Sequence, residues 1–408
     1  MRRLAWLDAL RGVAAMAVVW WHLGPRAIVD LQELHRHVDV GKSGVVLFFL
    51  VSGYVIPMSL ERHGDLRKFW VSRVLRLYPA WAVSILLVLA IFATGIQAVP
   101  EPITRDPLGV VLGQLSMTQG LLGIPNVVGV YWTLSYEMIF YLIVAGLFGL
   151  GLHKRSAWIA VAAAGIALVA GPDLPRDLLT GGTERRYLVA VTVLICLIAV
   201  IAAAVDGRRS LVLPASVVGV SMALIPLLNG GQSTARDTWQ ALLLMAVMFC
   251  GTVIYRMHQE QASRLLGAVT LAAVAGCWLA GGWWYLEPGQ TRRVWITTLL
   301  IAATGFAVGL LLRNRSMPPV AMWLGRISYS VYLLHLPLLV IFTKVLPEIN
   351  EQRLALRVLA LGGFLAIVLT AAHLVFRYVE LPAQDLGRRL GGAHKAESQL
   401  RLLRGISG

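Results

Sequence analysis

The sequence contains twelve apolar runs, each about as long as a helix that crosses a lipid bilayer. Such a helix needs about 17 to 25 mostly apolar residues. The whole chain is 58% hydrophobic and only 14% charged, which is too apolar for a soluble domain. We therefore predict an all-α, polytopic transmembrane helical bundle with about 10–12 spans. The runs lie near residues 6–23, 43–60, 80–98, 130–150, 156–171, 187–205, 211–228, 238–257, 264–282, 295–312, 323–345 and 354–378.

The basic residues indicate how the bundle is oriented. The net charge is +15, and the Lys and Arg residues stand in short clusters between apolar runs, a pattern typical of membrane topology and not of nucleic-acid binding. With both termini inside, 22 of the 36 basic residues fall in cytoplasmic segments and 13 in outer ones. The sequence thus predicts a multi-pass protein of the cell (inner or plasma) membrane with a cytoplasmic N-terminus.

The chain shows no internal repeat and no loop long enough to hold a separate soluble domain. We predict one membrane domain over residues 1–385, followed by a basic cytoplasmic tail over 386–408. Because Arg11 interrupts the first run and no cleavage site follows it, we interpret this run as a permanent anchor. The three cysteines lie in apolar runs without metal-ligand spacing, so no metal site is expected.

Ionisable residues inside the first apolar run call for a specific reason, since each costs about 2.5 to 3.5 kcal/mol at the centre of a span. Arg11 and His22 are eleven residues apart, which places them on one helix face at a separation of about 16 Å. Two interpretations are possible. Either Arg11 reaches the inner headgroups and His22 rests at the outer interface, or both side chains belong to a site inside the bundle.

A second cluster of interest is basic and aromatic, in LRKFWVSRVLRLYPAW. Arg73 and Arg76 share one helix face at a spacing of three residues, and Lys68 lies upstream. Arginine suits bidentate phosphate recognition, and aromatic rings stack on nucleotides. The cluster is therefore a candidate site for the phosphates of coenzyme A, the alternative being contact with anionic lipid.

Polar residues also interrupt later runs. In YWTLSYEMIFYL, Glu137 needs a partner, and we expect it to contact His22 and fix the imidazole as a general base. In GRISYSVYLLHLPLL, Tyr332 and His335 share a face, and Pro337 is expected to free a backbone carbonyl. These two are predicted either to line a polar cavity or to make structural hydrogen bonds.

The small residues of GKSGVVLFFLVSGYVIPMSL predict close helix packing. Near the end of the last run, we expect Glu380 to form an ion pair with Arg377.

Taken together, these blocks resemble acyltransferase family 3, the integral membrane acyltransferases that O-acylate cell-surface sugars and related acceptors. The resemblance is spread over most of the chain. Its blocks are LDALRG with Arg11 and His22, GVVLFFLVSGY, RVLRLYP with Arg73 and Arg76, WTLSYEMIFY with Glu137, LGRISYSVYLLH with Tyr332 and His335, and VELP with Glu380.

The resemblance implies transfer of an acyl group, most simply acetyl from acetyl-CoA as co-substrate, to a hydroxyl of a carbohydrate or glycoside acceptor. It implies a reaction centred on His22, and we assign Glu137 as the second catalytic residue from its expected contact with His22. It also implies ten spans, so segments between 156 and 312 are expected to be re-entrant or the domain to be enlarged.

We also predict which residues bind the donor and which bind the acceptor. Donor binding is assigned to Arg11, Arg73, Arg76 and Lys68, with the pantetheine arm between the first four spans. Acceptor binding is assigned to Tyr136, Tyr332 and His335. The rival interpretation is a glycolipid or polysaccharide transporter without transferase activity.

Overall fold

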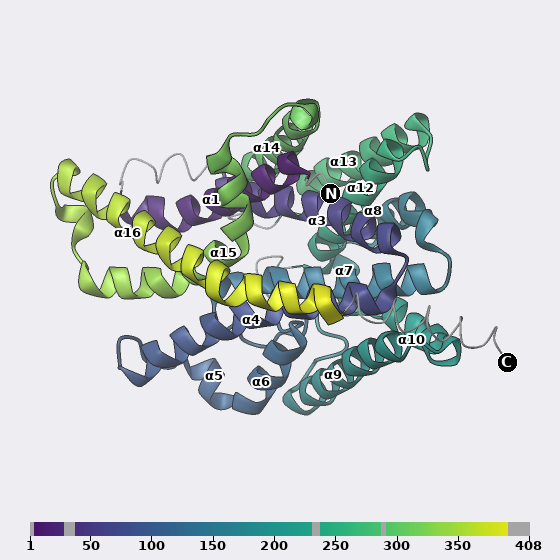
Figure 1. Ribbon diagram of the computed structural model, residues 1–408, viewed down its shortest axis with the longest axis horizontal. Helices are drawn as coiled ribbons and strands as arrows, with labels where there is room; N and C mark the ends of the chain where they lie inside the picture. The colour runs from purple at the N-terminus through teal and green to yellow at the C-terminus, as the bar shows by residue number, and fades with distance from the viewer. Residues whose placement is uncertain (1–3, 28–36, 231–236, 287–290, 391–408) are drawn as a thin grey trace.

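The computed structural model describes residues 4–27, 37–230, 237–286 and 291–390. These residues form helices connected by turns, and no strand occurs among them (Figure 1). The α-helices are α1 (Ala5–Ala27), α3 (Val40–His63), α4 (Leu66–Ala93), α5 (Glu101–Arg105), α6 (Pro107–Ser116), α7 (Trp132–Gly149), α8 (Ser156–Ala170), α9 (Thr183–Asp206), α10 (Arg209–Ser221), α11 (Leu224–Leu228), α12 (Thr238–His258), α13 (Arg264–Trp284), α14 (Arg292–Leu311), α15 (Pro319–Val345) and α16 (Leu354–Val375).

Short helical turns extend several of these elements. They are the 3₁₀ turns η1 (Gly129–Tyr131), η2 (His153–Arg155), η3 (Gly171–Asp173), η4 (Leu312–Asn314) and η5 (Ile349–Glu351), and the π-helical turn η6 (Phe376–Glu380).

Each of the twelve predicted apolar runs forms a helix. Within the described residues, eleven helices are long and apolar enough to cross a membrane. The first run, α1, is a helix of 23 residues that is more polar because it carries Asp8, Arg11 and His22. It packs against α3 and α15. The predicted all-α polytopic bundle is thereby confirmed.

The region between 156 and 312 contains six helices that are each long and apolar enough to span a bilayer. This arrangement favours the enlarged domain over the re-entrant segments that were the other expectation.

The predicted start of the third span, near residue 80, is wrong. Helix α4 begins at Leu66, after Asp65 caps the backbone N–H of Lys68 at 3.0 Å. Hydropathy alone placed the start too late because the first turns of α4 carry Arg73 and other polar residues. Protein covers this part of α4, since Arg73 is only 6% exposed, so its surface does not have to be apolar.

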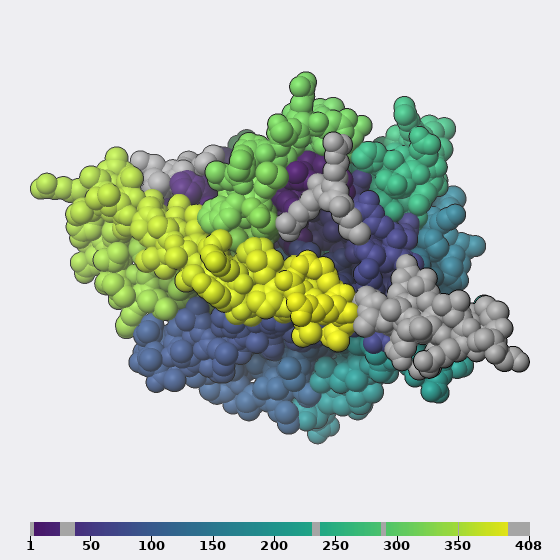
Figure 2. All heavy atoms as spheres, in the orientation of Figure 1, coloured from purple at the N-terminus to yellow at the C-terminus, as the bar shows by residue number. Residues whose placement is uncertain are grey.

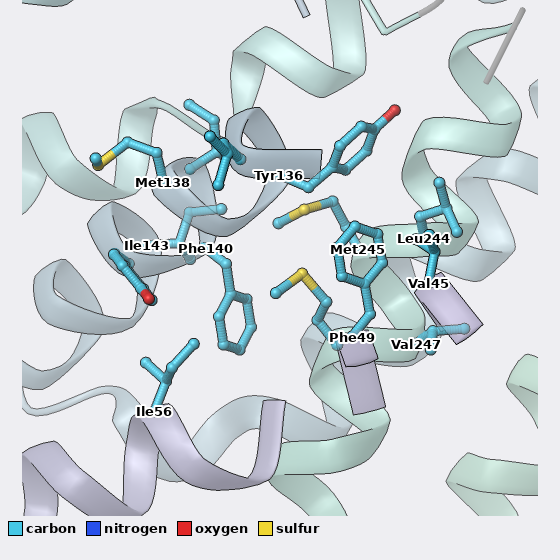
Figure 3. Packing of buried hydrophobic residues seen from close by; sticks show 14 of the residues in the cluster. Val45, Phe49, Ile56, Tyr136, Met138, Phe140, Ile143, Leu244, Met245 and Val247 are labelled. Atoms are coloured by element: carbon cyan, nitrogen blue, oxygen red, sulfur yellow. The ribbon is translucent and has the colours of Figure 1, made fainter. Parts of the chain in front are cut away.

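Helices α7 and α12 form the centre of the molecule. The apolar windows of both are fully enclosed by other helices. Figure 3 shows Phe140 of α7 packed beside Phe49 of α3 and Met245 of α12, with the Phe140 and Phe249 rings 5.1 Å apart. Because α7 lies at the centre, any ionisable residue that it carries lies inside protein and not in lipid.

Two close helix contacts depend on glycine. A Cβ atom on Gly53 would lie 1.8 Å from the Met248 carbonyl oxygen of α12, and one on Gly325 would lie 1.9 Å from the Asp8 carbonyl oxygen of α1. Both distances are shorter than a van der Waals contact, so only glycine permits the approach. The predicted close packing of the second span is thus confirmed, and α1 and α15 are in equally intimate contact.

Pro337 frees a backbone carbonyl, as predicted. It has no N–H to donate to Leu333 four residues earlier, and the Leu333 carbonyl accepts a hydrogen bond from the Ser84 hydroxyl of α4 at 3.0 Å. Tyr131 donates to that same Ser84 oxygen at 2.6 Å. The backbone hydrogen bond that α15 lacks at Pro337 is therefore replaced by side-chain hydrogen bonds that join α15, α4 and η1.

The last long helix, α16, crosses the front of the molecule in Figure 1 and continues through η6, which packs against α4. Its outer face carries apolar side chains such as Leu359 and Ile367, and Figure 2 shows this helix on the surface. The helix extends to Leu390, past residue 386, where the tail is predicted to begin. The rest of that predicted tail, 391–408, lies outside the described residues.

Candidate active site

Four helices enclose a central cavity. Its lining comes from α1, α3, α7 and α15, and consists of Ala14, Ala15, Val18, Gly44, Val45, Phe48, Thr133, Leu134, Glu137, Ser328, Tyr329 and Tyr332. The predicted path for the donor lay between the first four spans, which include α4. In the structure α15 takes the place of α4 around this cavity.

The central cavity is narrow and mostly apolar. Its volume is about 20 Å³, roughly enough for one water molecule. Phe48 contributes to the lining, and the guanidinium of Arg11 lies 5.2 Å from the centre of its ring. This cation–π contact places the charge of Arg11 at one end of the cavity.

The arginine cluster, which we define as Arg11, Arg73 and Arg76, gathers at this end. Arg11 and Arg73 are each close enough to Arg76 and to Glu137 to interact electrostatically. Arg73 also stacks near the ring of Tyr141, with its guanidinium carbon 5.3 Å from the ring centre. Two arginines of α4 and one of α1 thus lie close together beside Glu137.

Two donors of this cluster are unused. The Nε atoms of Arg11 and Arg73 are buried, and neither has a hydrogen-bond partner among the described residues. A buried guanidinium N–H without an acceptor is costly, and most such groups in proteins are paired. The cluster therefore has the character of an incomplete anion site.

Glu137 belongs to the arginine cluster and not to His22. Its carboxylate accepts a short hydrogen bond from the Tyr141 hydroxyl, one turn along α7. Among the described residues, no hydrogen bond or ion pair joins Glu137 to His22. The expected contact fails because it rested on estimated depth alone, whereas the cavity lining places Glu137 at the level of Ala14 and Val18, below His22.

Glu380 is the second carboxylate near the arginines. It is 2% exposed, accepts a short hydrogen bond from the Ser330 hydroxyl, and lies within electrostatic range of Arg76 and Arg11. The expected pair with Arg377 is wrong, since Arg377 lies over the Tyr378 ring at 5.7 Å. Both residues lie within the π-helical turn η6, whose wider winding turns side chains three residues apart away from each other.

At the other end of the site, two histidines meet. Nδ1 of His22 on α1 lies 3.3 Å from Nε2 of His335 on α15, and their ring centres are 5.2 Å apart. His335 is 1% exposed. We call His22 and His335 the histidine pair. It lies about one helical turn beyond the central cavity, which ends at Val18 on α1 and Tyr332 on α15.

The other predicted site residues have different environments. Tyr332 lines the cavity, and its hydroxyl lies 2.8 Å from Thr133 Oγ1 and donates to the Val130 carbonyl at 2.9 Å. Tyr136 does not line the cavity but packs in the core beside Phe49, as Figure 3 shows. The ring and the hydroxyl of Tyr136 are fully buried.

Lys68 also stands apart from the cluster. It lies in the first turn of α4, about 140° around the helix from Arg73. Its contact with Asp65 is made by the backbone. Within the described part of the chain, no contact joins the Lys68 ammonium to the arginine cluster.

Sequence reasoning missed Tyr141 and Phe48 as parts of the site. Tyr141 lies four residues after Glu137, a spacing that places both side chains on one helix face and could have revealed the pair. Phe48 offered no comparable signal, since a phenylalanine in an apolar run is usually a packing residue. No group of three or more His, Cys, Asp or Glu side chains among the described residues is placed to hold a metal ion.

Comparison with known proteins is consistent with this arrangement. The chain is 24% identical to the putative peptidoglycan O-acetyltransferase YrhL of Bacillus subtilis over 421 aligned positions, which cover 95% of this chain and 56% of that protein. It is 30% identical to the acyltransferase MdmB of Streptomyces mycarofaciens over 149 residues, 34% of this chain and 38% of that protein. It is 32% identical to a putative O-acetyltransferase of Staphylococcus aureus strain COL over 94 residues, 22% of this chain and 14% of the relative.

The chain thus spans little more than half of the longest-matching of these relatives and less of the others. No solved structure matches it. A family model, the acyltransferase domain, matches residues 4–375 and so includes both the arginine cluster and the histidine pair. The chain therefore belongs to the acyltransferase domain family, acyltransferase family 3.

Proposed function

We propose that this protein transfers an acyl group, acetyl in the simplest case, from acyl-CoA to a hydroxyl group of a carbohydrate or glycoside acceptor at the cell membrane. The proposal rests on one observation, that the central cavity lies between the arginine cluster and the histidine pair. An incomplete anion site lies at one end, and a pair of imidazoles lies beyond the other. A reaction between an anionic thioester donor and a neutral hydroxyl needs both.

The arginine cluster is the donor end. The unused Nε–H groups of Arg11 and Arg73 would donate to phosphate oxygens of CoA, or to the thioester oxygen as charge develops on it. Arg76 adds a third positive charge nearby. Glu137 and Glu380 offset part of this charge while the site is empty, so the cluster can exist inside the bundle.

His22 supplies the base. One ring nitrogen takes the proton of the acceptor hydroxyl as the acceptor oxygen bonds to the thioester carbonyl carbon. The carbon–sulfur bond then breaks, the ester forms, and the CoA thiolate receives the proton back from His22. In the alternative order, the His22 nitrogen attacks the thioester carbonyl carbon and CoA leaves as its thiolate. The acceptor oxygen then displaces the imidazole, and the acceptor proton passes through the freed imidazole to the CoA thiolate.

The acceptor class is inferred from the relatives and from the site. One relative is named as a putative peptidoglycan O-acetyltransferase, and the oxygen that such an enzyme acylates belongs to a hydroxyl group. Tyr332 lines the central cavity, and its ring centre lies 5.9 Å from that of His335. We assign acceptor contacts to Tyr332, and we withdraw Tyr136 from this role because its side chain packs in the core.

The decisive experiment measures thiol release from acetyl-CoA by purified protein in the presence of a peptidoglycan-derived oligosaccharide. Wild type should release thiol and acetylate the oligosaccharide, as seen by mass spectrometry. The His22→Ala protein should lose at least roughly 10²-fold in kcat, the usual contribution of a general base. Full activity of His22→Ala, or transport of the acceptor without thiol release, would overturn the proposal.

A second experiment separates the two chemical orders. Protein is mixed with radiolabelled acetyl-CoA without acceptor and quenched within milliseconds. Label that stays on wild-type protein and is absent from His22→Ala identifies an acyl-His22 intermediate. Protein without label, at full transfer activity, identifies direct attack by the acceptor.

A further inference from the structure

A second cavity lies further along α15 than the central cavity, and it is much larger. Its volume is about 180 Å³, whereas that of the central cavity is about 20 Å³. We call it the α4–α15 cavity, because its lining comes from the end of α4, the segment that leads into η1, and α15 from Leu336 to Thr343. The two cavities can therefore hold ligands of very different size.

The two volumes decide where an acceptor can be bound. An engineered protein cavity of about 150 Å³ holds benzene, whereas a cavity of roughly 20 Å³ holds one water molecule. A six-membered sugar ring thus has room in the α4–α15 cavity and none in the central cavity. Gln97 and Gly129 of the lining are exposed, so the α4–α15 cavity opens to the surface, where substituents of a ring and further sugars can extend.

One face of α15 connects the two cavities. Tyr332 lines the central cavity, and three residues that follow at helical spacings of three or four lie on the same face and line the α4–α15 cavity, namely Leu336, Leu339 and Thr343. Leu336 directly follows His335 in the chain. One end of the α4–α15 cavity is therefore at the level of the histidine pair along α15.

The chain near η1 makes the same connection. Gly129 lines the α4–α15 cavity, and the next residue, Val130, accepts the hydrogen bond from the Tyr332 hydroxyl at 2.9 Å. Apart from its own chain neighbours, a Cβ atom on Gly129 would have one neighbour within 4 Å, the Leu336 Cδ1 atom at 3.4 Å. The space beside Gly129 is thus open, and Tyr332 lies at the boundary between the two cavities.

The lining suits an uncharged ring that carries hydroxyl groups. None of the described residues that line this cavity is charged. Pockets for small molecules typically combine apolar surface with a few polar groups that fix orientation. The apolar surface, on which the C–H groups of a sugar ring can pack, includes aliphatic side chains of α4 and α15, namely Val88, Ile91, Leu339 and Val340.

Two polar side chains complete the lining. Gln97 carries an amide group, which can both donate and accept hydrogen bonds. The Thr343 hydroxyl donates to the backbone carbonyls of Leu339 at 3.0 Å and Val340 at 3.1 Å, so its lone pairs remain for a ligand hydroxyl. Ring hydroxyls can therefore form hydrogen bonds in this cavity.

We infer that the α4–α15 cavity is the acceptor site, and that its ligand is one uncharged sugar ring of a glycan. The ring packs its C–H groups on α4 and α15 and directs one hydroxyl past Leu336 toward the histidine pair. The inference rests on the proposed acyl transfer to a carbohydrate, and it places the ring outside the central cavity. Tyr332 and His335, the acceptor contacts predicted from the sequence, precede Leu336 and so lie at one end of this site.

The test fills the cavity from two elements. Val340→Trp adds a large ring from α15, and Gly129→Leu adds a side chain next to Leu336. Each should raise the KM for a peptidoglycan-derived oligosaccharide at least roughly tenfold and leave the Kd for CoA within about twofold of wild type, because acceptor binding alone is weakened. Ile341→Trp, at a partly buried neighbour outside the lining, is the matched control and should leave both constants unchanged.

A binding measurement does not depend on activity. A maleimide should label Thr343→Cys, and the oligosaccharide should slow this labelling as its concentration rises. Lys344→Cys, at the exposed neighbour of Thr343, should be labelled at the same rate with and without the oligosaccharide.

The opposite results would decide against the inference. Wild-type KM in both filled variants, or labelling of Thr343→Cys that the oligosaccharide does not slow, would overturn it. A lipid that native mass spectrometry finds on wild-type protein and not on Val340→Trp, at unchanged KM, would show that the cavity holds a hydrocarbon chain. Absence of thiol release by wild-type protein would instead remove the proposed function itself, so the two failures are distinguishable.

Discussion

At the scale of single residues, the site is held together by charges that do not form simple pairs. Arg73 is 6% exposed and is surrounded by Tyr141, Arg76 and Glu137. Its Nε–H is left without a partner among the described residues. A site of this kind should be most sensitive to changes of charge, because the low local dielectric strengthens each interaction.

Removal of Arg73 should weaken donor binding. A hydrogen bond to a charged group contributes about 1.5 to 3 kcal/mol, so Arg73→Ala should raise the Kd for CoA by roughly 10- to 100-fold. Isothermal titration of detergent-solubilised protein at two salt concentrations measures this change, and the salt dependence should also become shallower. Arg62→Ala, an exposed arginine at the end of α3, is the matched control. If CoA binds Arg73→Ala as tightly as wild type, the cluster contacts lipid and not the donor.

Substitution of Glu137 should have the opposite effect on donor binding. Glu137→Gln keeps an acceptor for Tyr141 but removes a negative charge near Arg11 and Arg73, so the cluster attracts anions more strongly. At an effective dielectric constant of about 20, one charge at roughly 7 Å changes binding by no more than about 2 kcal/mol. We expect CoA to bind more tightly, by up to about thirtyfold.

The same variant should unfold at a lower temperature, because three arginines then have less compensation. Glu101→Gln, which removes an exposed carboxylate from α5, is the control. A kcat loss as large as that of His22→Ala, with unchanged CoA affinity, would instead support the original expectation that Glu137 serves His22.

At the scale of elements, catalysis depends on the contact between α1 and α15, since each contributes one histidine. Gly325→Val should force these helices apart, because even a Cβ atom would lie 1.9 Å from the Asp8 carbonyl. We expect transfer activity to fall at least roughly 10²-fold, as misplacement of about 1 Å can do. Gly362→Val on α16, where a Cβ atom would meet open space, should retain activity. An active Gly325→Val protein would show that the α1–α15 spacing is not needed.

The positions of the helices could largely be predicted from the sequence. Every apolar run forms a helix, because bilayer thickness imposes length and composition on a span. The start of α4 was misjudged because protein, not lipid, surrounds Arg73, and a hydropathy pattern does not distinguish these environments.

The site was only partly predictable for a similar reason. Helical periodicity placed Arg11 and His22 on one face and Tyr332 with His335 on another, but periodicity cannot say which faces meet. The pairing of His22 with His335 depends on Gly325 and on the packing of α1 against α15, which are long-range contacts. Glu137 was assigned by depth to the wrong partner for the same reason.

At the scale of the whole molecule, the twelve helices predict that both termini lie on one side of the membrane, and the excess of basic residues predicts that this side is the cytoplasm. Alkaline phosphatase fused after Leu390 should be inactive, and green fluorescent protein at the same position should fluoresce. A phosphatase fusion after Gly182, between α8 and α9, should be active. The reverse pattern would invert the orientation and place the arginine cluster at the outer face.

The narrowness of the central cavity has a consequence for the cell that contains this protein. A path that joins the two faces of an energised membrane is a possible leak for protons and other ions. In this protein the central cavity measures only about 20 Å³ where Phe48 lines it, and the guanidinium of Arg11 lies beside that ring. Positive charge in a dry constriction repels cations, including hydronium. The same residues that are proposed to receive an anionic donor would therefore prevent cations from leaking through the protein between turnovers.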